Sequence, residues 1–239
     1  MHGLGTIANA GAIVLGGLLG LALKKGLKPR FQEILMQIMG LCVMFMGIAG
    51  ALTGLMQAGA DGELTTRNSM LLIGSMVLGG LLGEWINIAL WLERFGDWLK
   101  VKARSTGDPH FTDAFVTASL VVCVGAMAVV GSIQDGLLGD ASLLYAKAVL
   151  DCVIIFVFAS SHGKGAVFSA VPVALFQGCI TLLAGLLSPI FSPEVIAAVS
   201  FVGSVLIFCV GTNLCLNTKF SVANMLPALL FAGLAVGIF

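Results

Sequence analysis

Charged residues are scarce in this sequence. Only 10% of its 239 residues are Asp, Glu, Lys or Arg, whereas 59% are hydrophobic. Soluble domains carry roughly a quarter charged residues, so the composition predicts a single integral membrane domain over residues 1–239. The formal net charge is zero, which gives no electrostatic basis for binding nucleic acid. The lipid bilayer is the expected partner.

The sequence also lacks the motifs of common enzyme and metal sites. Its six cysteines form no Cys-x-x-Cys pair, which argues against a disulfide framework or a redox centre. It contains no His-Glu-x-x-His pair and no complete P-loop. We therefore expect no enzymatic activity, no catalytic residues, no metal site and no cofactor.

Long apolar stretches dominate the chain. A helix needs about 20 apolar residues to cross a bilayer, and this pattern predicts an all-α, polytopic transmembrane helix bundle of about eight helices. The N-terminus has no basic region before its apolar stretch, so we expect that stretch to be a retained span. The expected spans are residues 3–23, 32–57, 69–92, 112–133, 141–161, 165–188, 195–216 and 220–239.

The basic residues predict the orientation of these spans. Cytoplasmic loops carry an excess of Lys and Arg, and ten of the 12 basic residues fall in or beside gaps on one side of the predicted bundle. Arg67 lies on the other side and Lys147 lies within a span. Both termini are therefore expected outside. The ten residues are Lys24, Lys25, Lys28, Arg30, Arg94, Lys100, Lys102, Arg104, Lys164 and Lys219.

Two short patterns recur along the chain. Residues 14–20 and 77–83 are both Val-Leu-Gly-Gly-Leu-Leu-Gly, and such glycine faces let helices approach closely in lipid. We expect packing within the chain, and the same faces permit a homo-oligomer. Residues 6–9 (Thr-Ile-Ala-Asn) resemble residues 221–224 (Ser-Val-Ala-Asn), and we expect both to cap helix starts. Helices 1–3 and 6–8, if related, form an inverted repeat, as in many secondary transporters.

Lys147 and Asp151 are four residues apart near the middle of the fifth span, which places them on one face of a helix. A charge at that depth is costly and marks a functional site by default. Two interpretations stay open. The pair is either a structural ion pair that fixes its helix, or an ion-binding site in which Asp151 takes a cation or proton and Lys147 competes with it.

Further polar residues complete the set of candidate ligands. Gln134 and Asp135 follow glycines at the end of the fourth span and could offer oxygen ligands or simply form a turn. Glu84 either snorkels towards the interface or forms a second titratable site. Gln177 follows Pro172, and Asn213 follows Gly211. Broken helices of this kind bind substrates in many transporters but are also tolerated as kinks.

These segments carry a family resemblance. Residues 115–120, 123–128, 131–136 and 224–228, together with Lys147 and Asp151, resemble the bacterial YdfK/YqgA-type membrane proteins, a family of unknown function. The resemblance covers nearly the whole chain. It implies a multi-pass bacterial inner-membrane protein with a suspected transport role and no assigned substrate.

Two classes of function follow. The first is a secondary transporter or channel-like protein for a small ion or a cation-coupled solute, in which Asp151 alternates between Lys147 and the coupling ion. In this hypothesis helix breaks at Gly131, Pro172 and Gly211 let the halves move. The alternative is a non-transporting membrane scaffold or sensor whose polar groups only set helix register.

Overall fold

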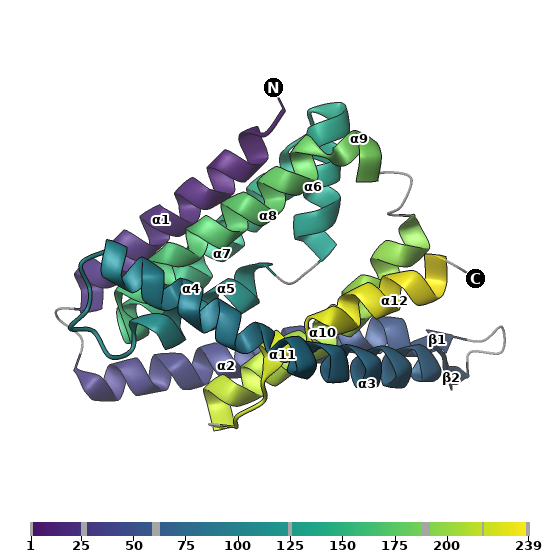
Figure 1. Cartoon of the computed structure of the whole chain (residues 1–239), viewed down its shortest axis with the longest axis horizontal. Helices are drawn as coiled ribbons and strands as arrows, with labels where there is room; N and C mark the ends of the chain where they lie inside the picture. Colours follow the sequence, from purple (N-terminus) through teal and green to yellow (C-terminus); the bar gives the residue numbers. More distant parts are fainter. Residues whose placement is uncertain are drawn as a thin grey trace. The chain divides into compact units, whose positions relative to one another are not determined.

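The structure is a computed structural model, and it describes residues 2–24, 28–58, 63–123, 126–187, 192–216 and 218–237. Helices dominate this part of the chain (Figure 1), and one short hairpin pairs β1 with β2. The elements are α1 (Leu4–Lys24), α2 (Pro29–Leu55), β1 (Met56–Ala58), β2 (Leu64–Thr66), α3 (Ser69–Ile86), α4 (Ile88–Lys102), α5 (Phe111–Cys123), α6 (Ala126–Leu138), α7 (Ser142–His162), the 3-10 helix η1 (Lys164–Ser169), α8 (Ala170–Leu182), α9 (Ala184–Leu187), α10 (Pro193–Leu216), α11 (Val222–Met225) and α12 (Pro227–Gly237).

The expected fold class, an all-α transmembrane helix bundle, is confirmed. Within the described residues, six helices are long and apolar enough to cross a bilayer. The bent pair α5 and α6 makes a seventh span if it is counted as one, and the apolar segment Val222–Val236 is shorter. Each of these eight segments coincides with one of the eight predicted stretches.

The third predicted span ends earlier than expected. The sequence pattern placed it at residues 69–92, but α3 ends at Ile86 because Asn87 adopts a left-handed conformation with φ 57°. This conformation is uncommon for a residue with a side chain, although Asn tolerates it better than most. The residues that follow form the separate helix α4.

The chain forms two compact units, and each is described by itself. Unit 1 contains residues Met1–Met39 and Leu90–Ser188, and unit 2 contains Gly40–Ala89 and Pro189–Phe239. Neither unit is continuous in sequence. Each combines early spans with late ones.

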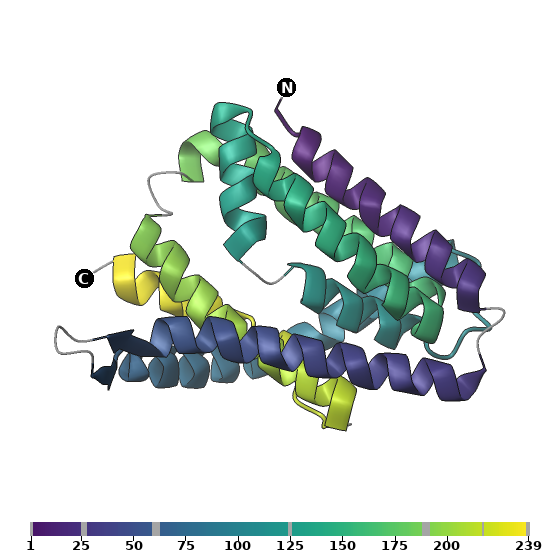
Figure 2. The same ribbon diagram turned by 180° about the vertical axis from the view of Figure 1, so that it is seen from behind.

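In unit 1, α1 lies along α7 and α8 (Figures 1 and 2). A Cβ atom added at Gly16 would overlap the carbonyl oxygen of Cys152, and one added at Gly20 would overlap that of Phe156. The first glycine motif therefore lets α1 pack directly on the backbone of α7. This is the expected packing within the chain.

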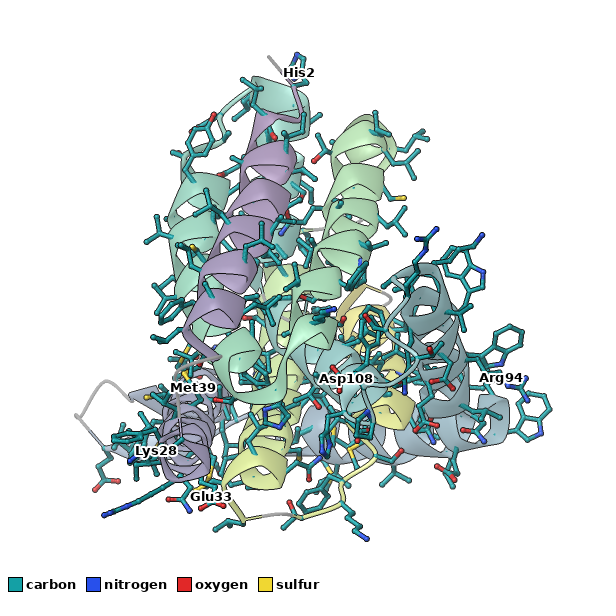
Figure 3. All side chains as sticks on the ribbon, turned by 90° about the vertical axis from the view of Figure 1, so that its left-hand side faces the viewer. His2, Lys28, Glu33, Met39, Arg94 and Asp108 are labelled. Atoms are coloured by element: carbon teal, nitrogen blue, oxygen red, sulfur yellow. The ribbon has the colours of Figure 1, made fainter. Side chains whose placement is uncertain are left out.

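The amphipathic helix α4 packs one face on unit 1 as well. Leu99 is buried against Phe111 and Phe115 of α5. The opposite face is polar and aromatic, and Arg94 points away from the helices there (Figure 3).

In unit 2, α2 and α10 pack in opposite directions through a second row of glycines. Gly47 lies against the backbone of Phe208, and Gly54 lies against the ring of Phe201. The second glycine motif packs in the same way, because Gly79 meets the amide of Ala228 in α12. Close backbone approach is thus the common packing principle of both units.

Three predicted helix breaks are wrong. Helices α6, α8 and α10 run without interruption through Gly131, Pro172 and Gly211, respectively. Pro172 lies in the first turn of α8, where a missing N–H group costs no helical hydrogen bond. Gly131 packs against Leu144, and Gly211 packs against Met44. These glycines serve close packing instead of unwinding.

Candidate functional site

Lys147 and Asp151 meet as the sequence predicts. Both lie on α7, and the Lys147 Nζ atom is 2.5 Å from Asp151 Oδ2. Both residues are buried, with exposed fractions of 7% and 3%. A buried pair is stable only when further hydrogen bonds satisfy its remaining atoms, so its other partners are informative.

Asn9 of α1 supplies one of these bonds. Its Nδ2 atom donates to Asp151 Oδ2 over 3.0 Å, and the residue is completely buried. The expectation that residues 6–9 cap a helix start is therefore wrong for Asn9. An amide in an apolar span needs a polar partner, but one sequence does not reveal which helix provides it.

The carbonyl of Val122 completes the surroundings of Lys147. Lys147 Nζ donates to this oxygen over 2.8 Å. Val122 lies in the last turn of α5, whose terminal carbonyls have no amide partner in their own helix and favour a nearby cation. The following helix α6 is inclined by 62° to α5. The ion pair therefore lies beside an interrupted apolar segment. We call Asn9, Lys147, Asp151 and the Val122 carbonyl the Asp151 centre.

Further buried polar atoms lack hydrogen-bond partners within the described part of the chain. Among them are Asn9 Oδ1, Ser132 Oγ and both amide atoms of Gln177. Gln177 is 1% exposed and Ser132 is completely buried. We call Asn9, Ser132 and Gln177 the amide cluster. Sequence reasoning selected Gln177 but missed Ser132.

Two contacts between helices indicate that the three residues lie at a similar level in unit 1. Thr6 of α1 and Thr181 of α8 are joined by a hydrogen bond of 3.5 Å between their hydroxyls. Gly136 of α6 lies against the carbonyl of the same Thr181. Asn9, Gln177 and Ser132 each lie about one helical turn from these contact points. The three helices therefore bring them to a similar depth in unit 1.

A cavity of about 370 Å³ lies at the N-terminal end of α1. His2 lies at this end of unit 1 (Figure 3). The lining includes Thr6, Gly178 and Thr181, so the cavity reaches the level one turn above the amide cluster.

Asp135 holds the start of α1 at this cavity. Its carboxylate accepts hydrogen bonds from the backbone N–H groups of Gly3 (3.1 Å) and Gly5 (3.0 Å). A carboxylate at a helix start satisfies free amides and the helix dipole. Asp135 is completely buried, and both of its oxygens are used in this capping. Gln134 is its half-buried neighbour on α6.

The other two predicted residues lie in unit 2. The Asn213 side chain accepts from the amide of Phe220 and donates to the carbonyl of the same residue, both over 2.9 Å. It therefore fixes the chain after α10. Glu84 is exposed and accepts a 2.7 Å hydrogen bond from Asn224.

Asn224 is a further residue that sequence reasoning assigned differently. Its Oδ1 atom accepts from the amide of Ala89 over 2.6 Å. The segment was expected to cap a helix start. The helix that it begins, α11, has no side-chain cap at Ser221, and Asn224 instead satisfies a free amide in the first turn of α4. Asn9 and Asn224 thus share a local sequence pattern, and each donates to a carboxylate on another helix.

No group of three or more metal-ligating side chains occurs among the residues that the structure describes.

Comparison with known proteins gives one family. The family described as "Protein of unknown function (DUF554)" matches residues 4–236. An uncharacterized membrane protein of Bacillus subtilis (strain 168), YdfK, is 31% identical over 226 residues, which cover 95% of this chain and 92% of that protein. An uncharacterized protein of Escherichia coli (strain K12), YqgA, is 30% identical over 237 residues, covering 96% and 94%. No solved structure matches.

Proposed function

The chain belongs to the DUF554 family of proteins of unknown function, and from the arrangement of its residues we propose that it is a secondary transporter or channel-like protein. Its cargo is a small ion or a cation-coupled solute. The observation that carries the proposal is the ion pair Lys147–Asp151, buried in the apolar span Ser142–His162. The Asp151 centre is the coupling site.

The energetics of buried charges support this role over a scaffold. Insertion of a charged residue at the centre of a span costs about 2.5–3.5 kcal/mol. Replacement of a buried ion pair by apolar residues is often neutral or stabilising. A scaffold would therefore gain little from keeping Lys147 and Asp151, whereas an ion site requires groups that exchange partners.

The neighbouring backbone supports the same conclusion. Helical interruptions at membrane depth are tolerated where they are buried in protein or line a water-filled cavity. The carbonyl of Val122 stands at such an interruption and binds the Lys147 ammonium.

In the proposed mechanism, Asp151 exchanges Lys147 for the coupling cation. The carboxylate can accept a cation or a proton while Asn9 keeps its hydrogen bond to Oδ2. Lys147 then remains bound to the Val122 carbonyl. Release of the cation restores the pair.

The inverted repeat and the orientation are part of the proposal. Thr6 of the first span contacts Thr181 of the sixth. The second span contacts the seventh at Gly47, and the third contacts the eighth at Gly79. Each of the first three spans thus contacts the span five positions later, which supports a pairing of two related halves. The Lys and Arg distribution supports an orientation with both termini outside.

The test is a thermal-shift screen of the purified protein in detergent against Na⁺, K⁺ and steps of pH, followed by flux assays in liposomes. A ligand that binds the folded state raises its stability by mass action. We expect a cation- or pH-dependent shift in the wild type that is lost in Asp151→Asn. The matched control is Asp113→Asn, which alters an exposed carboxylate of the same unit. An Asp151→Asn variant that preserves the shift and every flux would contradict the proposal and favour the scaffold.

A further inference from the structure

Gln177 presents an unusual hydrogen-bonding surface. Both its Nε2 donor and its Oε1 acceptor lack partners within the described residues, although the side chain is 1% exposed. A buried polar group without a partner costs about 1–3 kcal/mol. The two atoms lie side by side, and together they match a ligand that carries an acceptor next to a donor.

The other two residues of the amide cluster add further hydrogen-bonding atoms. Asn9 offers a free Oδ1 acceptor, and Ser132 offers a hydroxyl that can donate or accept. Since Asn9 also contacts Asp151, the cluster adjoins the Asp151 centre. A molecule held by the cluster would therefore sit next to the coupling site.

The charges nearby favour an uncharged ligand. Lys147 and Asp151 neutralise each other, and Asp135 binds the free amides of α1. Within the amide cluster, the atoms without partners belong to two amides and one hydroxyl. An ionic solute would lose its hydration without gaining an opposite charge, which is unfavourable in such a site.

A cavity lies about one helical turn from the cluster along α8. Gly178 lines the cavity of about 370 Å³, and a Cβ atom added there meets nothing within 4 Å. Small-molecule sites begin at about 300 Å³, so the cavity accommodates a solute of a few heavy atoms.

We propose that the amide cluster of Asn9, Ser132 and Gln177 is the solute site of this protein, and that its ligand is a small uncharged solute with adjacent donor and acceptor groups, of the primary-amide type. The inference rests on the proposed transport function and names its substrate class. The ligand's carbonyl accepts from Gln177 Nε2, and its N–H group donates to Gln177 Oε1. A second N–H donates to Asn9 Oδ1.

The experiment measures osmotic reswelling of proteoliposomes by stopped-flow light scattering after a solute gradient is applied. Acetamide and propionamide are the probes, and acetate and methylammonium are the charged comparisons. We expect protein-dependent entry of the two amides and none of the ions. Gln177→Met should abolish amide entry, and Gly178→Leu should block it by filling the cavity.

Two measurements separate folding effects from loss of the site. Methionine has the shape of glutamine without its unpaired atoms, so Gln177→Met should unfold at the same temperature as the wild type or a higher one. Gln37→Met, which changes an exposed glutamine of α2, should leave amide entry unchanged. A Gln177→Met variant with unchanged amide entry would overturn the proposal.

The cation response tells the two proposals apart. If Gln177→Met loses amide entry but keeps the cation-dependent thermal shift, both the solute site and the separate role of Asp151 are supported. A wild type that shows the cation shift but no amide entry overturns the solute site alone. Amide entry without any cation shift supports the solute site and contradicts the coupling role of Asp151.

Discussion

Asn9 and Asp151 are 142 positions apart in sequence, and the side-chain amide of one donates to the carboxylate of the other over 3.0 Å. The accepting oxygen, Oδ2, is the same atom that binds Lys147. One carboxylate oxygen thus holds a neutral donor from α1 and a charged donor from its own helix. In the proposed mechanism, the charged donor is the one that the coupling cation replaces.

The ion pair predicts strong energetic coupling between its members. Lys147→Met leaves a buried carboxylate without its counter-charge, and Asp151→Leu leaves a buried ammonium. Each single change should lower stability by about 3–5 kcal/mol, whereas the double variant should lose much less. Unfolding of the four proteins in detergent measures this cycle.

The control for that cycle is Lys102→Met, which removes an exposed ammonium from α4. Its effect should stay within about 0.5 kcal/mol, as for most surface changes. Equal losses in the single and double variants would show that the two side chains contribute independently, contrary to the expected coupling.

Replacement of Asp135 should destabilise the start of α1. Asp135→Ala removes the acceptor of two backbone amides, those of Gly3 and Gly5. Loss of such a cap costs about 1–2 kcal/mol. Hydrogen exchange followed by mass spectrometry should show faster exchange in the first turn of α1.

Asp140→Ala is the comparison for this variant. Asp140 accepts hydrogen bonds from the backbone and hydroxyl of Ser142 over 3.0 and 2.6 Å at the start of α7. Its removal should speed exchange in α7 and leave α1 unchanged. Identical exchange patterns in the two variants would contradict the assignment of Asp135 to α1.

Periodicity and charge pattern were sufficient for the main outline of the fold. The length of each apolar stretch reflects bilayer thickness, which is the same constraint for every span. The contact between Lys147 and Asp151 follows from helical geometry alone, because residues four apart share a face. Such local relations are visible in one sequence.

Relations between distant segments were not predictable in the same way. Asn9 was expected to cap a helix, since nothing in the sequence links it to Asp151. The breaks expected at Gly131 and Gly211 were wrong because a glycine that permits unwinding also permits close packing, and only the neighbouring helix decides between them. The interruption at Asn87 depends on a single left-handed residue.

A carboxylate introduced at position 224 should interact with Glu84 in a pH-dependent way. Asn224 donates to Glu84 and accepts from the amide of Ala89. Asn224→Asp keeps the acceptor but places a second carboxylate beside Glu84, and two adjacent negative charges repel. The variant should therefore unfold at a lower temperature than the wild type at pH 7. The difference should shrink in acid, because one proton shared by the two carboxyl groups removes a charge.

The comparison for this effect is Asn224→Leu. It removes both hydrogen bonds without adding charge, so its loss of stability should be similar at neutral and acidic pH. A thermal-unfolding series from pH 7 to pH 4 measures all three proteins. A constant gap between Asn224→Asp and the wild type would show that the Glu84 carboxylate does not sense residue 224.

The glycine motif of α3 allows a sharper test, because it contains tight and open positions side by side. A Cβ atom added at Gly79 or Gly83 would overlap the backbone of Ala228 or Asn224, respectively, whereas one added at Gly80 meets nothing within 4 Å. Alanine is a better helix former than glycine by about 1 kcal/mol. Gly80→Ala should therefore be neutral or stabilising.

Gly79→Ala and Gly83→Ala should instead force α3 away from α11 and α12, because the clashing atoms belong to the backbone and cannot rotate aside. Overpacking of this kind typically costs about 1–3 kcal/mol, which exceeds the gain in helix propensity. The unfolding temperatures of the three alanine variants in detergent give the comparison. If Gly83→Ala were as stable as Gly80→Ala, α3 would not pack on α11 through this face, and the hydrogen bond between Asn224 and Glu84 would lose its structural basis.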